Sequence, residues 1–222
     1  IIYINPPYAE ATSSKSMAGS GKHKEGVAKK NKIQPQALKF IGKASNELFA
    51  LFLFQIYTKM PDCKVAFFST PKFIQSTNFS KFRDYFLAQY KGGFVVPAWT
   101  FDNVQGNFGI TFTIWDCSVK SRINDVVVDV YNEAAELIGQ KCLHTLEGET
   151  INDWLKKYHT NGNKMGNLAF RGTDFQSQNL IFIQWHPHEN RTNMEIGYGN
   201  IIPCSIYFAV RHCIKDNWLI HA

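Results

Sequence analysis

The residues best suited to binding or catalysis lie near the start of the chain, where an apolar run ends on Asn5-Pro6-Pro7-Tyr8. Two successive prolines fix two φ angles and remove two backbone N–H donors, so this turn is stiff and its carbonyl oxygens have set directions. The Asn5 amide adds an acceptor oxygen, and Tyr8 adds a flat aromatic ring. Two acceptors beside a stacking ring suit an exocyclic amino group on a planar base. The alternative is a turn that only ends a strand.

The segment before this turn indicates how it is positioned. Residues 1–4 are apolar and rich in β-branched side chains, which predicts a buried parallel strand. In open α/β sheets, ligands bind just beyond the carboxyl ends of the strands. We therefore expect the turn to lie at the functional edge of a sheet.

Alternating elements predict an α/β fold with a mainly parallel sheet over about the first 120 residues. The apolar segment 47–57 predicts a buried helix, because it is shorter than the roughly 20 residues of a membrane span. In chain order we expect a helix over 36–59, a strand over 64–70, a helix over 78–90, a strand over 92–97 and a strand near 110–114.

The pattern changes after Ser118, and we place a boundary near residue 120. This gives a domain over 1–120 and an α+β region over 121–222, which either leads into target recognition or braces the sheet of the first domain. In the second part we expect a strand over 125–131, helices over 133–141 and 150–159, and a strand over 179–185; residues 204–214 fit either a helix or a strand.

Composition limits the kinds of partner, cellular environment and metal site that we expect. The net charge of +6 fits a polyanionic partner without establishing one. Five widely spaced cysteines indicate a reducing, cytoplasmic environment rather than a disulfide framework. The groups His186–Glu189 and Cys204, His212 and Cys213 are too loose for a metal site, so we expect no metal.

Several segments carry a resemblance to a known family. The stretch INPPY resembles the catalytic motif of S-adenosylmethionine-dependent amino-group methyltransferases, most of all the DNA adenine-N6 methyltransferases. KVAFFSTPKFI is similar to the next strand of that family, FSKFRDYFLAQY to a following helix, and WTFDNVQGNFGITFTIWDCS to its closing loop and final hairpin strand. Over residues 1–118, order and spacing resemble the large bacterial restriction–modification enzymes.

This resemblance implies a partial Rossmann-like methyltransferase sheet and a specific chemistry. The target adenine is extruded from double-stranded DNA. The Asn5 side-chain oxygen and the Pro6 carbonyl accept its two amino hydrogens within the Asn5-Pro6-Pro7-Tyr8 motif, and Tyr8 stacks on the base. Trp115 is the first candidate for a second stacking ring, with Phe108 and Phe112 after it. Trp115 fits a plain core position equally well.

The segment after the motif is rich in lysine, and we expect it to contact the DNA backbone. The alternative is a solvated loop. The candidate residues are Lys15, Lys22, Lys24, Lys29, Lys30 and Lys32.

The family also needs a glycine-rich turn for the methionine part of the cofactor. GGF, GNFG and GYGN are the candidates, and none follows a convincing buried strand and opens a helix. We therefore expect most of the S-adenosylmethionine site to lie outside this chain. The chain would be the carboxyl-side part of a longer enzyme, inactive alone, with the missing N-terminal part as a partner. The alternatives are an RNA-adenine or protein-amide methyltransferase, or a non-catalytic nucleic-acid-binding module.

Overall fold

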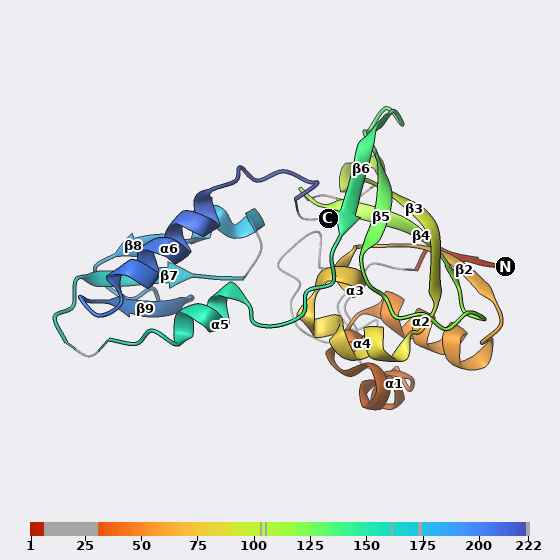
Figure 1. Ribbon diagram of the computed structural model, residues 1–222, viewed down its shortest axis with the longest axis horizontal. Helices are drawn as coiled ribbons and strands as arrows, with labels where there is room; N and C mark the ends of the chain where they lie inside the picture. Colours follow the sequence, from red (N-terminus) through yellow and green to blue (C-terminus); the bar gives the residue numbers. More distant parts are fainter. Residues whose placement is uncertain (7–30, 103, 105, 161, 173–174, 221–222) are drawn as a thin grey trace. The chain divides into compact units, whose positions relative to one another are not determined.

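The computed structural model describes residues 1–6, 31–102, 104, 106–160, 162–172 and 175–220. The chain forms two compact units, Ile1–Glu147 and Gly148–His221 (Figure 1), which are described separately. No helix in the described ranges is long and apolar enough to cross a membrane.

A six-stranded sheet with the order β1-β2-β4-β3-β5-β6 organises the first unit. Its strands are β1 (Ile2–Ile4), β2 (Lys64–Ser69), β3 (Gln89–Pro97), β4 (Gly109–Asp116), β5 (Val126–Tyr131) and β6 (Leu137–Leu143). The α/β class is confirmed, and so are the predicted strands at 1–4 and 64–70. The strand at 1–4 was expected to be buried, but β1 is a partly exposed edge strand in which Tyr3 is 63% exposed. The sheet is mixed rather than mainly parallel, because β3 returns directly into β4 and β5 into β6; only β1–β2 and β3–β5 pair in parallel.

The single helix expected over 36–59 is divided. It consists of α1 (Gln34–Ile41), a 3-10 helix (η2, Gly42–Asn46) and α2 (Leu48–Lys59). Gly42 has a φ of +56°, a left-handed conformation that glycine adopts without strain, and Glu47 is extended. The helix predicted for the apolar segment is confirmed as α2, and most of its residues are buried.

The helix expected over 78–90 is shorter than predicted. It begins after a 3-10 turn (η3, Thr77–Phe79) as α4 (Ser80–Tyr85), and Tyr90 already belongs to β3. Arg83 of α4 is buried and donates to the carbonyl oxygens of Phe73 and Ser76, at 3.3 and 2.8 Å, which fixes the preceding helix α3 (Lys72–Gln75). Burial lowers the pKa of Arg83, an effect that nearby acidic residues oppose.

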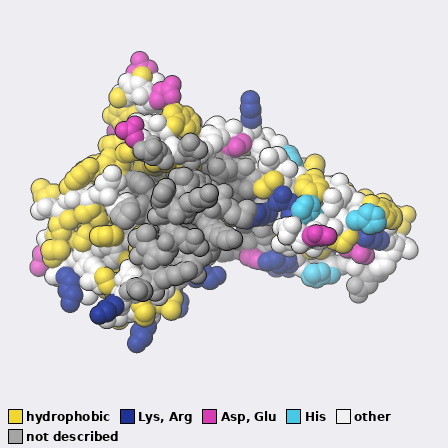
Figure 2. All heavy atoms as spheres, turned by 180° about the vertical axis from the view of Figure 1, so that it is seen from behind, with side chains coloured by type: hydrophobic (Ala, Val, Ile, Leu, Met, Phe, Trp, Pro, Cys, Tyr) yellow, Lys and Arg dark blue, Asp and Glu magenta, His cyan; other side chains and the backbone are white. Residues whose placement is uncertain are grey.

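The two faces of this sheet carry different side chains. One face holds the buried residues Val65, Phe67 and Trp115. Phe73 of α3 packs against Phe67 with tilted rings at 5.3 Å and edge-on against Trp115 at 5.8 Å. The opposite face carries a partly exposed aromatic row across five strands, made of Tyr3, Phe68, Phe112, Phe94 and Tyr131. Figure 2 shows how many hydrophobic side chains reach the surface of this unit.

Residues 133–141, expected as a helix, form the turn and strand of the β5–β6 hairpin. The Asn132 side-chain oxygen accepts from the amides of Ala134 and Glu136, both at 3.0 Å, and Ala135 has a φ of +60°. This turn reverses the chain, and β6 then pairs along all of β5. The two strands continue the first sheet, so the structural division lies at Gly148 rather than near residue 120.

The second unit packs two helices on a small antiparallel sheet with the order β8-β7-β9. Its elements are α5 (Ile151–Lys156), β7 (Gly166–Phe170), a 3-10 helix (η5, Phe175–Leu180), β8 (Phe182–Gln184), β9 (Thr192–Ile196) and α6 (Ile201–His212). The predicted helix at 150–159 and strand at 179–185 are confirmed in shorter form. Residues 204–214, which fit either type, are mostly helical.

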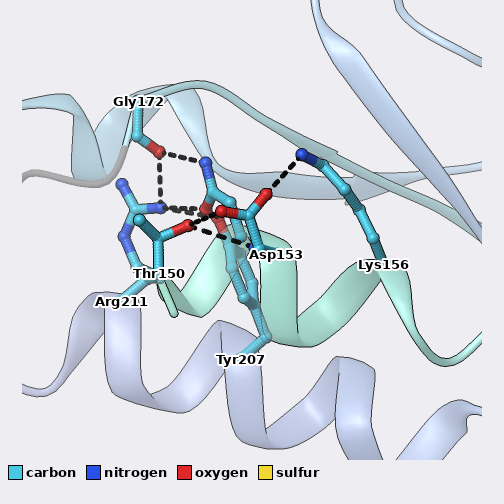
Figure 3. A network of polar contacts seen from close by, with 7 residues as sticks. Thr150, Asp153, Lys156, Gly172, Tyr207 and Arg211 are labelled. Carbon is cyan, nitrogen blue, oxygen red and sulfur yellow. Dashed lines mark hydrogen bonds and ion pairs between the residues drawn. The ribbon is translucent and has the colours of Figure 1, made fainter. Parts of the chain in front are cut away.

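A polar network joins the helices of this unit (Figure 3). Thr150 caps α5 by accepting from the amide of Asp153 at 3.2 Å, and Lys156 contacts the Asp153 carboxylate at 2.7 Å. Arg211, which is buried, donates to the Gly172 carbonyl oxygen at 3.0 Å and to the Tyr207 hydroxyl. Burial raises the pKa of Tyr207 to about 12. The Tyr207 hydroxyl also donates to the side-chain oxygen of Asn152 in α5 at 2.7 Å, so the network ties α6 to α5 and to the segment after β7.

Candidate functional site

Strand β1 delivers the Asn5 turn to the edge of the sheet. Ile4 pairs with Phe67 in parallel register, so Asn5 follows directly at the carboxyl end of the strand. Asn5 is exposed, whereas Pro6 is buried and anchors the turn. Pro7 and Tyr8 lie outside the described residues, so their predicted roles stay predictions.

Other strand ends meet at the same edge. β2 ends at Ser69, and β3 ends at Pro97 before a short 3-10 helix (η4, Ala98–Thr100). β4 runs in the opposite direction and begins here, with Gly109 opposite Pro97 and Thr111 opposite Ser69. Phe108, the residue before β4, therefore lies at the same end of the sheet as Asn5, as the base-stacking role requires.

The local chain holds Phe108 in place. Its carbonyl oxygen accepts from the Ala98 amide at 2.9 Å, which links the start of β4 to the end of β3. Gly106 has a φ of +147°, and a Cβ atom built there would lie 2.4 Å from the Phe108 ring. Only glycine fits at position 106 without moving this half-buried ring.

Trp115 has a different location. It pairs with Val65 at the start of β2 and with Tyr90 at the start of β3, so it lies at the opposite end of the sheet from Asn5. Its side chain is fully buried, with rings of Phe73, Phe86 and Tyr90 within 6 Å between centroids. The structure does not bring Trp115 together with Asn5, and its position is that of a core residue.

Sequence reasoning missed two aromatic residues at the carboxyl end. Trp99 is 44% exposed and donates from Nε1 to the Glu133 carboxylate at 2.8 Å, which links η4 to the β5–β6 turn. Phe101 packs edge-on against Phe68 at 5.3 Å. Both residues follow β3 directly in the sequence. Because ligands bind beyond the carboxyl ends of strands, this position could have identified them as candidates.

Of the six lysines predicted to contact DNA, the structure describes Lys32. It is exposed, immediately before α1, where the Asn31 side chain accepts from the Ile33 amide at 2.8 Å. The other five, Lys15, Lys22, Lys24, Lys29 and Lys30, lie outside the described residues.

The opposite end of the sheet has a different character. Asp116 lies near Lys64, with 3.9 Å between charged atoms, and hydrogen bonds from Ser118 lower its pKa. A cavity of about 200 Å³ lies here, lined by Gln89, Tyr90, Trp115 and Ser121 to Val126. Burial raises the pKa of Tyr90 to about 12, which keeps its hydroxyl protonated as a donor to Val127 at 2.7 Å. This cavity is not at the site that the sequence predicts.

The three glycine-rich stretches do not fit the cofactor turn. Gly92 and Gly93 lie inside β3, and residues 106–109 lead into β4. GYGN does follow a strand and open a helix, contrary to our expectation, because it joins β9 to α6. That sheet is antiparallel, however, and a Cβ atom at Gly197 would lie 3.0 Å from Thr160 and Gly162, so close chain packing explains this glycine.

Comparisons with known proteins give little further information. No family model matches the chain, and no curated protein matches it. Among solved structures, the chain is similar to the ATP-dependent Type ISP restriction-modification enzyme LlaBIII bound to DNA, with 12% sequence identity and a TM-score of 0.40. The match covers 81% of this chain, which spans 15% of that protein's length. No residue role is taken from a likeness at this level.

Proposed function

We propose that this chain is the base-accepting, carboxyl-side part of a DNA adenine-N6 methyltransferase of the restriction–modification type. One observation carries the proposal: β1 places Asn5 and Pro6 at the carboxyl end of the sheet, where the ends of β2 and β3 and Phe108 also lie. This is the edge at which open α/β sheets bind ligands.

The turn would act through preorganised acceptors. The Asn5 side-chain oxygen and the Pro6 carbonyl oxygen accept the two hydrogens of the adenine N6 amino group, which draws the nitrogen lone pair out of ring conjugation. Because Pro6 is buried and has a restricted φ, its carbonyl is held in direction before the base arrives. Transfer is direct, so no enzyme nucleophile is needed.

Aromatic side chains at this edge support the choice of a planar acceptor. Phe108 is half-buried and held against Gly106, and Trp99 offers a partly exposed indole. A base taken out of a duplex needs such rings, because it loses its stacking in the helix. Tyr8, from the same turn as Asn5, is the proposed principal partner.

The cofactor is S-adenosylmethionine, which supplies the methyl group. None of the stretches GGF, GNFG and GYGN joins a buried parallel strand to a helix, which supports the proposal that most of its site belongs to a glycine-rich part outside this chain. Calorimetric titration of S-adenosylmethionine into the 222-residue chain tests this division. We expect no binding at micromolar concentrations, and a micromolar dissociation constant would place the cofactor site within these residues.

The activity is tested with a polypeptide that joins this chain to its glycine-rich part. With labelled S-adenosylmethionine, we expect label in duplex DNA, and unlabelled duplex DNA should compete better than duplex RNA or protein. Preferential competition by RNA or by a glutamine-containing protein would indicate that RNA or a protein amide, rather than DNA, is the substrate. Binding of DNA without transfer to any acceptor would favour a non-catalytic module.

A further inference from the structure

Three side chains with metal-binding atoms meet on the β5–β6 pair, at the end of the sheet opposite Asn5. Asp125 precedes β5, Cys142 lies within β6, and His144 follows it. Val126 pairs with Leu143, so Asp125 and His144 face one another across the strand pair. Cys142 and His144 are two residues apart and therefore project from the same face of the strand.

The distances between the donor atoms are close to those of a tetrahedral zinc site. His144 Nδ1 lies 3.0 Å from Asp125 Oδ1 and 3.9 Å from Cys142 Sγ. Taking one donor atom from each residue, the three atoms all lie within 4.8 Å of one another. Tetrahedral zinc with ordinary bond lengths separates nitrogen from oxygen by about 3.3 Å and nitrogen from sulfur by about 3.6 Å. The two distances from His144 Nδ1 are therefore each within about 0.3 Å of the tetrahedral values.

We propose that Asp125, Cys142 and His144 bind a zinc ion, with water in the fourth position. Thiolate and imidazole favour zinc over magnesium or calcium, which prefer oxygen donors. One thiolate and one carboxylate balance the two positive charges of the ion. The side chains of Asp125 and His144 are 59% and 69% exposed, so an ion reaches them from solvent.

A surface ion pair between His144 and Asp125 is the simpler account of these contacts, and exposed pairs of this kind add little stability. The Cys142 thiol, on the same face of the strand as His144, adds a third donor atom that the ion pair does not use. The bound ion would join the start of β5 to the end of β6. It would thereby fix the base of the hairpin whose turn contacts Trp99 through Glu133 (Figure 1).

Cobalt titration of the untagged, metal-free 222-residue chain tests the site without any activity assay. We expect one equivalent of Co²⁺ to give tetrahedral d–d bands and a thiolate-to-cobalt charge-transfer band, both removed by one equivalent of Zn²⁺. Cys142→Ser should abolish the charge-transfer band, and His144→Ala and Asp125→Asn should each weaken zinc binding by at least about tenfold.

Cys213→Ser is the matched control, because Cys213 is an exposed thiol in the other unit. This variant should bind both metals as the unaltered chain does. The proposal is overturned if no charge-transfer band appears at millimolar Co²⁺, if the band survives Cys142→Ser, or if it is lost in Cys213→Ser. Circular dichroism of each variant, all altered at exposed or partly exposed positions, verifies that the fold is retained.

Discussion

The two ends of the six-stranded sheet differ in how their candidate functional residues are encoded. At the carboxyl end, Asn5 and Pro6 are adjacent in sequence and directly follow a strand. The amino end is the end of the sheet where β1, β2, β3 and β5 begin. There, Asp125 and His144 are 19 positions apart in sequence and meet only because β5 and β6 pair in one register. A contiguous motif can therefore be recognised from the sequence, whereas a site assembled by strand pairing requires the fold.

The largest effect is expected at the carboxyl end. In the polypeptide that also contains the cofactor part, Asn5→Ala should reduce the methyl-transfer rate by about 10²- to 10³-fold, because it removes a preorganised acceptor. DNA affinity, measured by fluorescence anisotropy, should change by less than about threefold. Asn78→Ala, at an exposed position before α4, is the matched control and should transfer normally. Unchanged methylation by Asn5→Ala would remove Asn5 from the mechanism.

Trp115 lies at the amino end and should affect stability rather than DNA binding. Trp115→Ala should lower the free energy of unfolding by about 3–5 kcal/mol, because it leaves a large cavity among Phe73, Phe86 and Tyr90. Trp115→Phe should cost much less, since the indole Nε1 makes no hydrogen bond to a described residue. Urea denaturation measures both. A stable Trp115→Ala chain with weakened DNA binding would return Trp115 to the base-stacking candidates.

Phe108 should show the reverse behaviour. Phe108→Ala should weaken DNA binding by about 1–3 kcal/mol, the usual contribution of one base stacked on an aromatic ring. Its stability loss should be smaller than that of Trp115→Ala, because Phe108 is only half-buried. Phe52→Ala is the control, since Phe52 is 46% exposed on α2 in the helical layer. Equal DNA affinity for both variants would argue against a role for Phe108.

The smallest effect concerns Asp116 at the amino end. Hydrogen bonds from Ser118 lower its pKa in the folded chain below the unfolded value of about 3.9. The stabilisation is therefore present above about pH 4 and is lost as the pH falls through the lower folded pKa. Asp116→Asn should flatten the decrease in melting temperature below pH 4, and Ser118→Ala should do the same. An unchanged acid profile in both variants would exclude this hydrogen bond as a source of acid sensitivity.

Elements with strong local patterns were predictable from the sequence. The apolar runs that became β1, β2 and α2 needed no tertiary information. The helix expected over 133–141 failed because Glu133, Ala134 and Glu136 favour helix locally, while the Asn132 turn and pairing with β5 give a strand instead. The break at Gly42 also depends on the fold, because its φ is +56° and a Cβ atom there would lie 2.9 Å from the Lys81 side chain.

The candidate site was predictable only in part. The period-two alternation of Ile110, Phe112 and Ile114 places Trp115 on the opposite face of its strand and favours the Phe112 face as the core. The structure instead fully buries the face of Trp115, which the alternation does not predict. Phe108 and Asn5 share one end of the sheet because β4 is antiparallel to β1 and β2, which local patterns do not encode. Trp99 and Phe101 follow the strand predicted over 92–97, so their place after β3 could have been inferred; their contacts with Glu133 and Phe68 depend on the fold.

The fluorescence of 2-aminopurine in duplex DNA tests the central claim most directly, namely that the Asn5 end of the sheet receives an extrahelical base. The probe replaces the adenine proposed as the methyl acceptor of the polypeptide containing both parts, and a second duplex carries it one base pair away. We predict a several-fold rise in fluorescence at the methylated position on saturating binding, and none at the neighbouring position. Saturating binding without any rise would contradict the account, because the target base would then remain inside the stack and beyond the reach of Asn5.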